Sequence, residues 1–159
     1  MTAMRSSSQD PSQDPVPNPG GCNCLALRQA ARHVTQLYDQ LLAPSGLRAT
    51  QYSILARLKR KGPMTINALA AELVMDRTTL GRNILPLQRD GLIAVVPGKI
   101  VRRSKEIDLT AAGTARVRQG AQCWSKAQAT FERSFGSKRA RALRALLDDV
   151  ASAPLTEAL

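Results

Sequence analysis

The chain has 159 residues and a formal net charge of +11, with 23 lysines and arginines against 12 aspartates and glutamates. Its length predicts one domain, and a hydrophobic content of 43% with only 3% aromatic residues predicts a globular core built mainly from aliphatic side chains. No apolar run reaches the length of a membrane span and no hydrophobic signal segment opens the chain, so we expect a cytoplasmic protein without membrane contact.

Residues 1–21 are rich in proline and serine and offer little for a core to bury, so we expect a disordered tail. A long helix is predicted over residues 22–42, because apolar residues recur at helical spacing until Pro44-Ser45-Gly46 interrupts them. A second helix is predicted from about Ala49 to Lys61. Its end carries four basic residues, Arg57, Lys59, Arg60 and Lys61. They can contact phosphates or simply keep a helix end in water, and the sequence leaves both interpretations open.

Two shorter helices joined by a tight turn are predicted from Thr65 onward. The first has one apolar face, formed by Ile66, Leu69, Ala70 and Leu73. Asp76 is a suitable N-cap for the second, because its carboxylate can accept hydrogen bonds from free first-turn amides. Gly91 is a suitable residue to end that helix. The buried side of the second helix is formed by Leu80, Ile84 and Leu87. This order of elements predicts a helix-turn-helix.

The opposite face of the second helix is predicted to point outward. It is formed by Arg77, Thr78, Thr79, Arg82 and Asn83. Short polar side chains near a helix N-terminus, together with an arginine and an asparagine, suit a helix that enters the major groove of DNA. Arg82 can donate two hydrogen bonds to guanine, and Asn83 can pair with adenine. The two threonines are expected to contact base edges or nearby phosphates.

A short β-hairpin is predicted next, with one strand from Leu92 to Val96 and a return strand around Ile107 and Leu109. Its tip is crowded with basic residues, namely Lys99, Arg102, Arg103 and Lys105. Residues 57–105 hold eleven lysines and arginines against three acidic residues, a local charge of +8. The predicted fold class is therefore mainly α with a small β-hairpin wing, a winged helix-turn-helix whose partner is double-stranded DNA.

Two more helices are predicted after the hairpin. Thr110 is placed as the N-cap of a long helix over residues 111–135, and a final helix is predicted over residues 138–151. The final helix has more apolar surface than a lone terminal helix would leave in water, so we expect a homodimer. A two-fold dimer would place two recognition helices in successive major grooves, about 34–36 Å apart, on an inverted repeat.

The segment DRTTLGRNILPLQRDGLI and the RRS…LTAAG wing with its following helix resemble the MarR family of bacterial transcription regulators. The resemblance implies a single domain over residues 22–159, in which residues 22–47 and 111–155 form the dimerisation helices and residues 48–110 bind DNA. It also implies a repressor that a signal releases from DNA. Arg103 matches the family's minor-groove arginine, and Arg102 and Lys105 lie beside it, whereas Val101 replaces the family's usual wing aspartate.

Two kinds of signal follow from the resemblance. One is a small phenolic or aromatic ligand bound between the first, second and fifth helices. The other is an organic hydroperoxide, because the first helix resembles the hydroperoxide-sensing branch of the family. There Cys24 matches the reactive cysteine, Tyr38 matches a tyrosine that hydrogen-bonds it, and Cys123 can serve as a resolving thiol. Arg28 and Ala49 replace two further tyrosines of that site, and a free cysteine is often just a small buried hydrophobe.

Other classes of protein have less support in the sequence. There is no phosphate-binding glycine loop, no nucleophile elbow and only one histidine, so we do not expect an enzyme. Two cysteines one residue apart and a distant third do not form a zinc-ligand spacing, so we expect neither a metal nor a cofactor. The alternative function is a sequence-nonspecific architectural DNA-binding protein, whose affinity would fall uniformly with salt.

Overall fold

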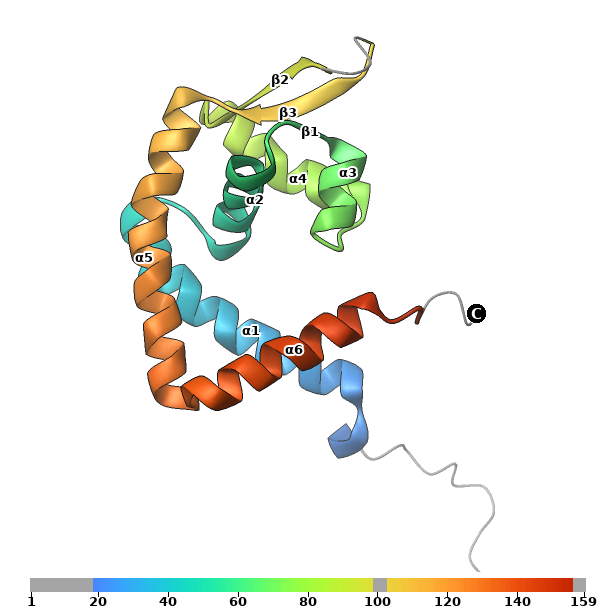
Figure 1. Ribbon diagram of the computed structural model, residues 1–159, viewed down its shortest axis with the longest axis vertical. Helices are drawn as coiled ribbons and strands as arrows, with labels where there is room; N and C mark the ends of the chain where they lie inside the picture. Colours follow the sequence, from blue (N-terminus) through green and yellow to red (C-terminus); the bar gives the residue numbers. More distant parts are fainter. Residues whose placement is uncertain (1–18, 99–102, 156–159) are drawn as a thin grey trace, which may run out of the picture. The chain divides into compact units, whose positions relative to one another are not determined.

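The computed structural model describes residues 19–98 and 103–155. Its helices are α1 (Asn23–Leu42), α2 (Ala49–Lys61), α3 (Ile66–Glu72), α4 (Arg77–Arg89), α5 (Ala111–Phe135) and α6 (Ser137–Ser152) (Figure 1). Its strands are β1 (Met64–Thr65), β2 (Ile93–Pro97) and β3 (Lys105–Leu109), and its short 3-10 turns are η1 (Pro19–Gly21) and η2 (Ala43–Ser45). The predicted winged helix-turn-helix with long flanking helices is confirmed.

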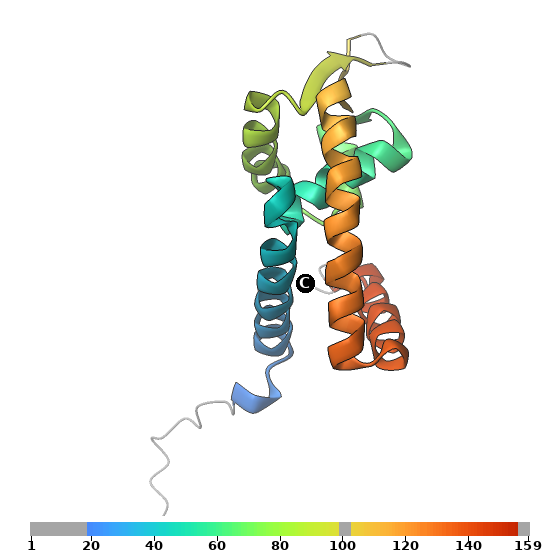
Figure 2. The same ribbon diagram turned by 90° about the vertical axis from the view of Figure 1, so that its left-hand side faces the viewer.

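The chain divides into two compact units, residues 1–33 and residues 34–159. The described part of the first unit is mainly the start of α1, whose side chains are almost all exposed. The second unit holds the last turns of α1 and every later element. Within it, α5 runs from the sheet to the turn into α6 (Figure 1 and Figure 2). No helix in residues 19–98 or 103–155 is long and apolar enough to cross a membrane.

The wing belongs to a three-stranded antiparallel sheet with the strand order β1-β3-β2. β2 and β3 form the predicted hairpin, in which Val95 lies opposite Ile107. β1 was not predicted, and it places Met64 opposite Ile107 on the other edge of β3. Two residues are too few to show the alternation that marks a strand in a sequence. β1 ties the base of the wing to the start of α3.

The core of the second unit lies where α2, α3, α4 and the sheet meet. The predicted inward residues of α4, Leu80, Ile84 and Leu87, are buried. They form one cluster with apolar side chains of the neighbouring elements, among them Leu55, Leu58, Leu69, Ile93 and Ile107. Complete burial of such a side chain contributes about 1.5–3 kcal/mol. This cluster therefore fixes which side of α4 faces outward.

A junction of hydrogen bonds joins the start of α5 to the end of α4. Thr110 is the N-cap of α5, as predicted: its hydroxyl accepts a hydrogen bond from the Gly113 amide at 3.0 Å and donates one to the Gly91 carbonyl at 2.6 Å. Gly113 lies against the backbone just before β2, since an added Cβ would stand 1.9 Å from the carbonyl oxygen of Leu92. The absence of a side chain lets α5 approach this closely.

Glu72 joins α3 to α2 through two ion pairs. Its carboxylate lies 2.8 Å from the Arg57 guanidinium and 2.9 Å from the Lys61 ammonium. The hydrogen bond from Lys61, together with the positive charges of Lys61, Arg57 and Arg60, holds the pKa of Glu72 below its ordinary value, and partial burial opposes this shift. Arg57 and Lys61, two of the four basic residues at the end of α2, therefore bind α3 to α2.

We expect Gly113→Ala to destabilise the protein by about 1–3 kcal/mol, because the new methyl group would force α5 away from Leu92. The matched control is Gly81→Ala in α4, where nothing lies within 4 Å of an added Cβ. That substitution should stabilise by about 0.5–1 kcal/mol, because alanine favours the helix. Thermal unfolding of both variants checks the prediction, and an unchanged Tm for Gly113→Ala would contradict it.

The Glu72 ion pairs predict a stability difference that depends on pH. Since the pKa of Glu72 is lowered in the folded protein, its contribution is present above the ordinary value of 4.5 and is lost as pH falls through the folded-state pKa. The Tm of the wild type should therefore exceed that of Glu72→Gln at pH 7, and the two values should converge towards pH 3. A Tm difference that stays constant over this range would show that the charge of Glu72 does not stabilise the fold.

Candidate nucleic-acid interface

Both ends of α4 are fixed by local hydrogen bonds. At the start, the Asp76 carboxylate accepts from the Thr79 amide at 2.8 Å, and hydrogen bonds from the side chain and amide of Thr79 lower the pKa of Asp76. At the end, Gly91 has a φ of +69°, its amide bonds the Gln88 carbonyl, and the Leu92 amide bonds the Leu87 carbonyl. These two bonds form a Schellman motif. The predicted cap at Asp76 and the predicted end at Gly91 are both confirmed.

The turn between α3 and α4 has an unusual backbone. Val74 has a φ of +51° and is 74% exposed, although β-branched residues rarely adopt this left-handed conformation. The Val74 amide bonds the Ala71 carbonyl, and the Met75 amide bonds the Ala70 carbonyl. These bonds close the end of α3 and hold the strained turn. The angle between the two helices therefore depends on a conformation that the sequence, lacking a glycine here, does not signal.

The predicted contact residues of α4 fall into two groups. Arg77, Thr78, Thr79 and Arg82 are exposed, and within residues 19–98 and 103–155 the Arg82 side chain has no hydrogen bond or ion pair. Asn83 is half-buried, and its amide nitrogen donates to the Thr79 carbonyl at 2.8 Å. The Arg82 guanidinium is thus unpaired among the described residues, whereas the Asn83 amide already donates one of its two N–H groups to its own helix.

The wing presents part of the predicted basic tip. Arg103 and Lys105 are exposed, and Lys105 begins β3 opposite Pro97. The Gly98 amide bonds the Ser104 carbonyl at 2.8 Å, which closes the hairpin below its tip. Arg102, like Lys99 and Val101, lies outside the described residues. The position of Arg103 at the end of a paired hairpin suits insertion of a cation beside a groove edge.

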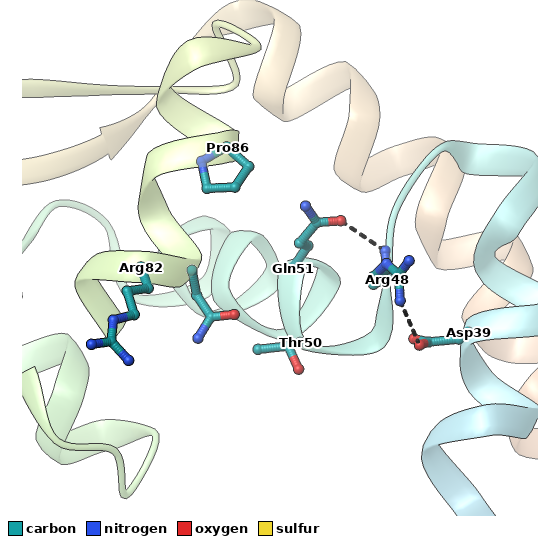
Figure 3. Close-up of a pocket in the computed structure, with 7 residues that line it drawn as sticks. Asp39, Arg48, Thr50, Gln51, Arg82 and Pro86 are labelled. Carbon is teal, nitrogen blue, oxygen red and sulfur yellow. Dashed lines mark hydrogen bonds and ion pairs between the residues drawn. The ribbon is translucent and has the colours of Figure 1, made fainter. Parts of the chain in front are cut away.

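A groove of about 370 Å³ opens beside α4. It is lined by Asp39, Arg48, Thr50, Gln51, Arg82, Asn83 and Pro86. Arg82 comes from α4 and Arg48 from the start of α2, with Thr50 and Gln51 between them (Figure 3). Arg48 and its neighbours were not predicted as site residues, because the groove forms between elements that are distant in the sequence.

The predicted redox site draws Cys24 from the first unit and Tyr38 and Cys123 from the second. Cys24 is exposed near the start of α1, where the Cys22 sulfur accepts a hydrogen bond from the Leu25 amide at 3.4 Å. Cys123 on α5 is half-buried. The Tyr38 hydroxyl donates to the side-chain oxygen of Gln128 on α5 at 2.6 Å, and burial raises the pKa of Tyr38. Among the described residues, no cluster of His, Cys, Asp or Glu could hold a metal ion.

Comparisons with known proteins agree with this geometry. The model of the MarR family matches residues 47–104. The transcriptional regulator MosR of M. tuberculosis is 39% identical, over 82% of this chain and 96% of that chain, with a TM-score of 0.70. A second structure of MosR, in complex with DNA, is 37% identical, over 83% of this chain and 99% of that chain, with a TM-score of 0.67.

A more distant structure shares the fold. BpsR of Bordetella bronchiseptica, whose DNA binding is regulated by 6-hydroxynicotinic acid, is 21% identical, over 86% of this chain and 97% of that chain, with a TM-score of 0.76. Comparison with curated protein sequences gave no match. The helix-turn-helix, the wing and the 39% identity to MosR lead to one conclusion: the chain belongs to the MarR family of DNA-binding transcriptional regulators.

Proposed function

We propose that this protein is a homodimeric repressor that reads an inverted repeat in double-stranded DNA and leaves it when a signal arrives. The outward face of α4 carries this proposal. Thr78 and Arg82 are exposed there, on a helix whose two ends are fixed by caps. A guanidinium with no bond to the described residues can bind a base without first losing a protein contact. The similar MosR has been solved in complex with DNA, which supports the same use of this fold.

Three side chains of α4 are proposed to read bases. Arg82 donates two hydrogen bonds to a guanine, and Asn83 pairs with an adenine through its side-chain oxygen and an amide N–H, of which one already bonds the Thr79 carbonyl. Leu85 is 64% exposed one turn beyond Arg82, so it can contact a thymine methyl group. Arg77, Thr78 and Thr79 are proposed to contact base edges or phosphates beside them.

The wing is proposed to extend the contact into the adjacent minor groove. Arg103 enters it, and Lys105 and Arg102 bind phosphates along its edge. A cation in the minor groove responds to groove width more than to base identity. The wing would therefore add affinity, and a preference for narrow grooves, to the base reading of α4.

The dimer is proposed to form through the terminal helices. Leu146, Leu147 and Val150 are exposed on α6, at 63%, 40% and 44%. Such side chains on one stripe of a helix favour burial against a second copy. In a two-fold dimer the two α4 helices would reach successive major grooves, and the recognised DNA would be an inverted repeat.

A small aromatic or phenolic ligand is one proposed signal. Tyr52 on α2 and Trp124 on α5 stack with ring centroids 6.4 Å apart, and burial raises the pKa of Tyr52. An aromatic molecule that entered between these helices would compete with this stack and shift α5 relative to the helix-turn-helix. The regulation of BpsR by 6-hydroxynicotinic acid is a precedent on the same fold.

Oxidation of Cys24 by an organic hydroperoxide is the other proposed signal. The exposed sulfur would attack the distal peroxide oxygen, giving a sulfenic acid and releasing an alcohol. The Cys123 thiol could then displace hydroxide from the sulfenic sulfur, giving a disulfide and water. Tyr38 is proposed as the hydrogen-bonding tyrosine of this sensor, and its hydroxyl donates to Gln128 within the second unit.

Arg82→Ala should weaken binding to the preferred inverted repeat by about 1–3 kcal/mol and leave binding to random duplex nearly unchanged. Fluorescence anisotropy with both duplexes measures the two affinities. The matched control is Arg141→Ala, an exposed arginine on the side of α6 away from its apolar stripe. If Arg82→Ala weakens both duplexes equally, Arg82 contacts a phosphate. If the wild type prefers no sequence, the alternative of an architectural DNA-binding protein is favoured.

One equivalent of organic hydroperoxide should abolish tight binding by the wild type and spare Cys24→Ser, if Cys24 is the sensor. Anisotropy before and after oxidant, with Cys22→Ser and Cys123→Ser in parallel, identifies the thiol that matters. Peroxide consumption should stop at about one equivalent per reactive thiol, because a sensor waits for reduction whereas a thiol peroxidase turns over. Unchanged binding by the oxidised wild type would rule out the thiol switch and favour a small ligand.

A further inference from the structure

A series of hydrogen bonds crosses the second unit from the end of α1 through α5 to α6. The Tyr38 hydroxyl of α1 donates to the side-chain oxygen of Gln128 on α5 at 2.6 Å. The amide nitrogen of Gln128 donates in turn to Glu132 Oε1, one turn further along α5, at 3.1 Å. The same carboxylate oxygen accepts from the Arg144 guanidinium of α6 at 3.4 Å. We call these four residues the corner network, because they join three helices where α5 turns into α6.

The corner network is partly screened from water. Tyr38 and Gln128 are half-buried, and the side chains of Glu132 and Arg144 are 30% and 49% exposed. Hydrogen bonds in such a series polarise one another, so each bond strengthens the next. Burial raises the pKa of Tyr38, whereas the charge of Arg144 lowers it and that of Glu132 raises it. The far end of the network therefore acts on the near end.

Little apolar burial fixes the angle between α5 and α6. A single residue, Gly136, separates the two helices, with a φ of +93° that favours glycine (Figure 1). Ala140 is the only buried residue that α6 contributes to the described part of the chain. Its methyl group gives far less burial than a leucine side chain. The Arg139 guanidinium also lies 4.3 Å above the Phe135 ring. The corner network is therefore a main restraint on the direction of α6.

The length of α5 magnifies any change at this corner. The helix has 25 residues, which at about 1.5 Å per residue makes it about 37 Å long. The end of α4 is bonded to its far end, where the Thr110 hydroxyl donates to the Gly91 carbonyl. A rotation of about 5° at the corner would move that end by about 3 Å, close to the rise of about 3.4 Å for one base pair.

We propose that the corner network sets the distance between the two α4 helices of the dimer, and with it the half-site spacing that the protein accepts. This inference rests on the proposed function, in which α6 packs against a second copy. With α6 held there, the angle between α5 and α6 decides where each α4 lies along the DNA. The four residues act through α5, so they are positioning residues for the recognition helix.

The test measures DNA affinity by anisotropy, in reductant, on three kinds of duplex. They are the selected inverted repeat, the same repeat with one base pair added to or removed from its spacer, and a single half-site. The wild type should bind the altered repeats about tenfold more weakly, because one base pair moves a half-site by about 3.4 Å and turns it about the duplex axis. Arg144→Ala should reduce this spacer penalty to about threefold, and its affinity for the single half-site should stay unchanged.

A double-variant cycle tests whether the two ends of the network act as one. Tyr38 and Arg144 share no hydrogen bond and are connected only through Gln128 and Glu132. Tyr38→Phe, which removes one oxygen atom, should reduce the spacer penalty in the wild type and have little further effect in Arg144→Ala. Arg141→Ala is the matched control. It removes the same charge from an exposed position of α6 outside the network, so it should keep the wild-type penalty.

Four results would overturn the inference. They are a full spacer penalty in Arg144→Ala and Tyr38→Phe, independent effects of the two substitutions, an equal loss of affinity for the half-site and the full repeat, and dissociation of the variant dimers in native mass spectrometry. The last result would show that the network holds the two copies together and does not set their spacing. A wild type that binds every spacer and the single half-site equally would instead overturn the proposed function itself.

Discussion

Burial of Leu80, Ile84 and Leu87 decides what the rest of α4 can do. A helix that buries one stripe must expose the stripe opposite, which here carries Thr78 and Arg82. The caps at the two ends hold the terminal turns of α4 in place, so those side chains keep fixed positions. The base reading proposed for α4 would therefore depend on apolar packing on the opposite side of the helix.

Non-local contacts set how α4 is held against the remainder of the second unit. Glu72 fastens α3 to α2, and β1 fastens the start of α3 to the wing. Thr110 and Gly113 couple the end of α4 to the start of α5, which continues towards the apolar stripe of α6. A signal that moves α5 would consequently act on α4 through packed backbone, and no flexible linker would absorb the movement.

Local signals in the sequence were enough to predict most of the fold. The helical spacing and the caps at Asp76 and Thr110 gave α4 and α5 the bounds that the structure has, because capping is decided within four residues. Local sequence signals did not predict β1 or the backbone of the turn at Val74. β1 forms only because it pairs with β3, which is distant in the sequence. Val74 has a left-handed backbone, and such a position is usually recognised in a sequence by a glycine, which is missing here.

The candidate site was predictable in part for the same reason. The outward residues of α4 follow from helical periodicity, and the exposure of Arg82 agrees with that prediction. The groove does not follow from it, because Asp39, Arg48 and Arg82 meet only when α1, α2 and α4 are packed. The sequence likewise does not predict the hydrogen bond of Asn83 to the Thr79 carbonyl, because an asparagine side chain can bond either its own backbone or a ligand.

The most direct test of the proposed function is a selection from a random DNA library by the full chain, with the stoichiometry of the bound complex measured by native mass spectrometry. The proposed function predicts enrichment of one inverted repeat whose half-sites are about one helical turn apart, bound by two copies of the chain. Enrichment of no sequence, or of a single half-site bound by one copy, would contradict it.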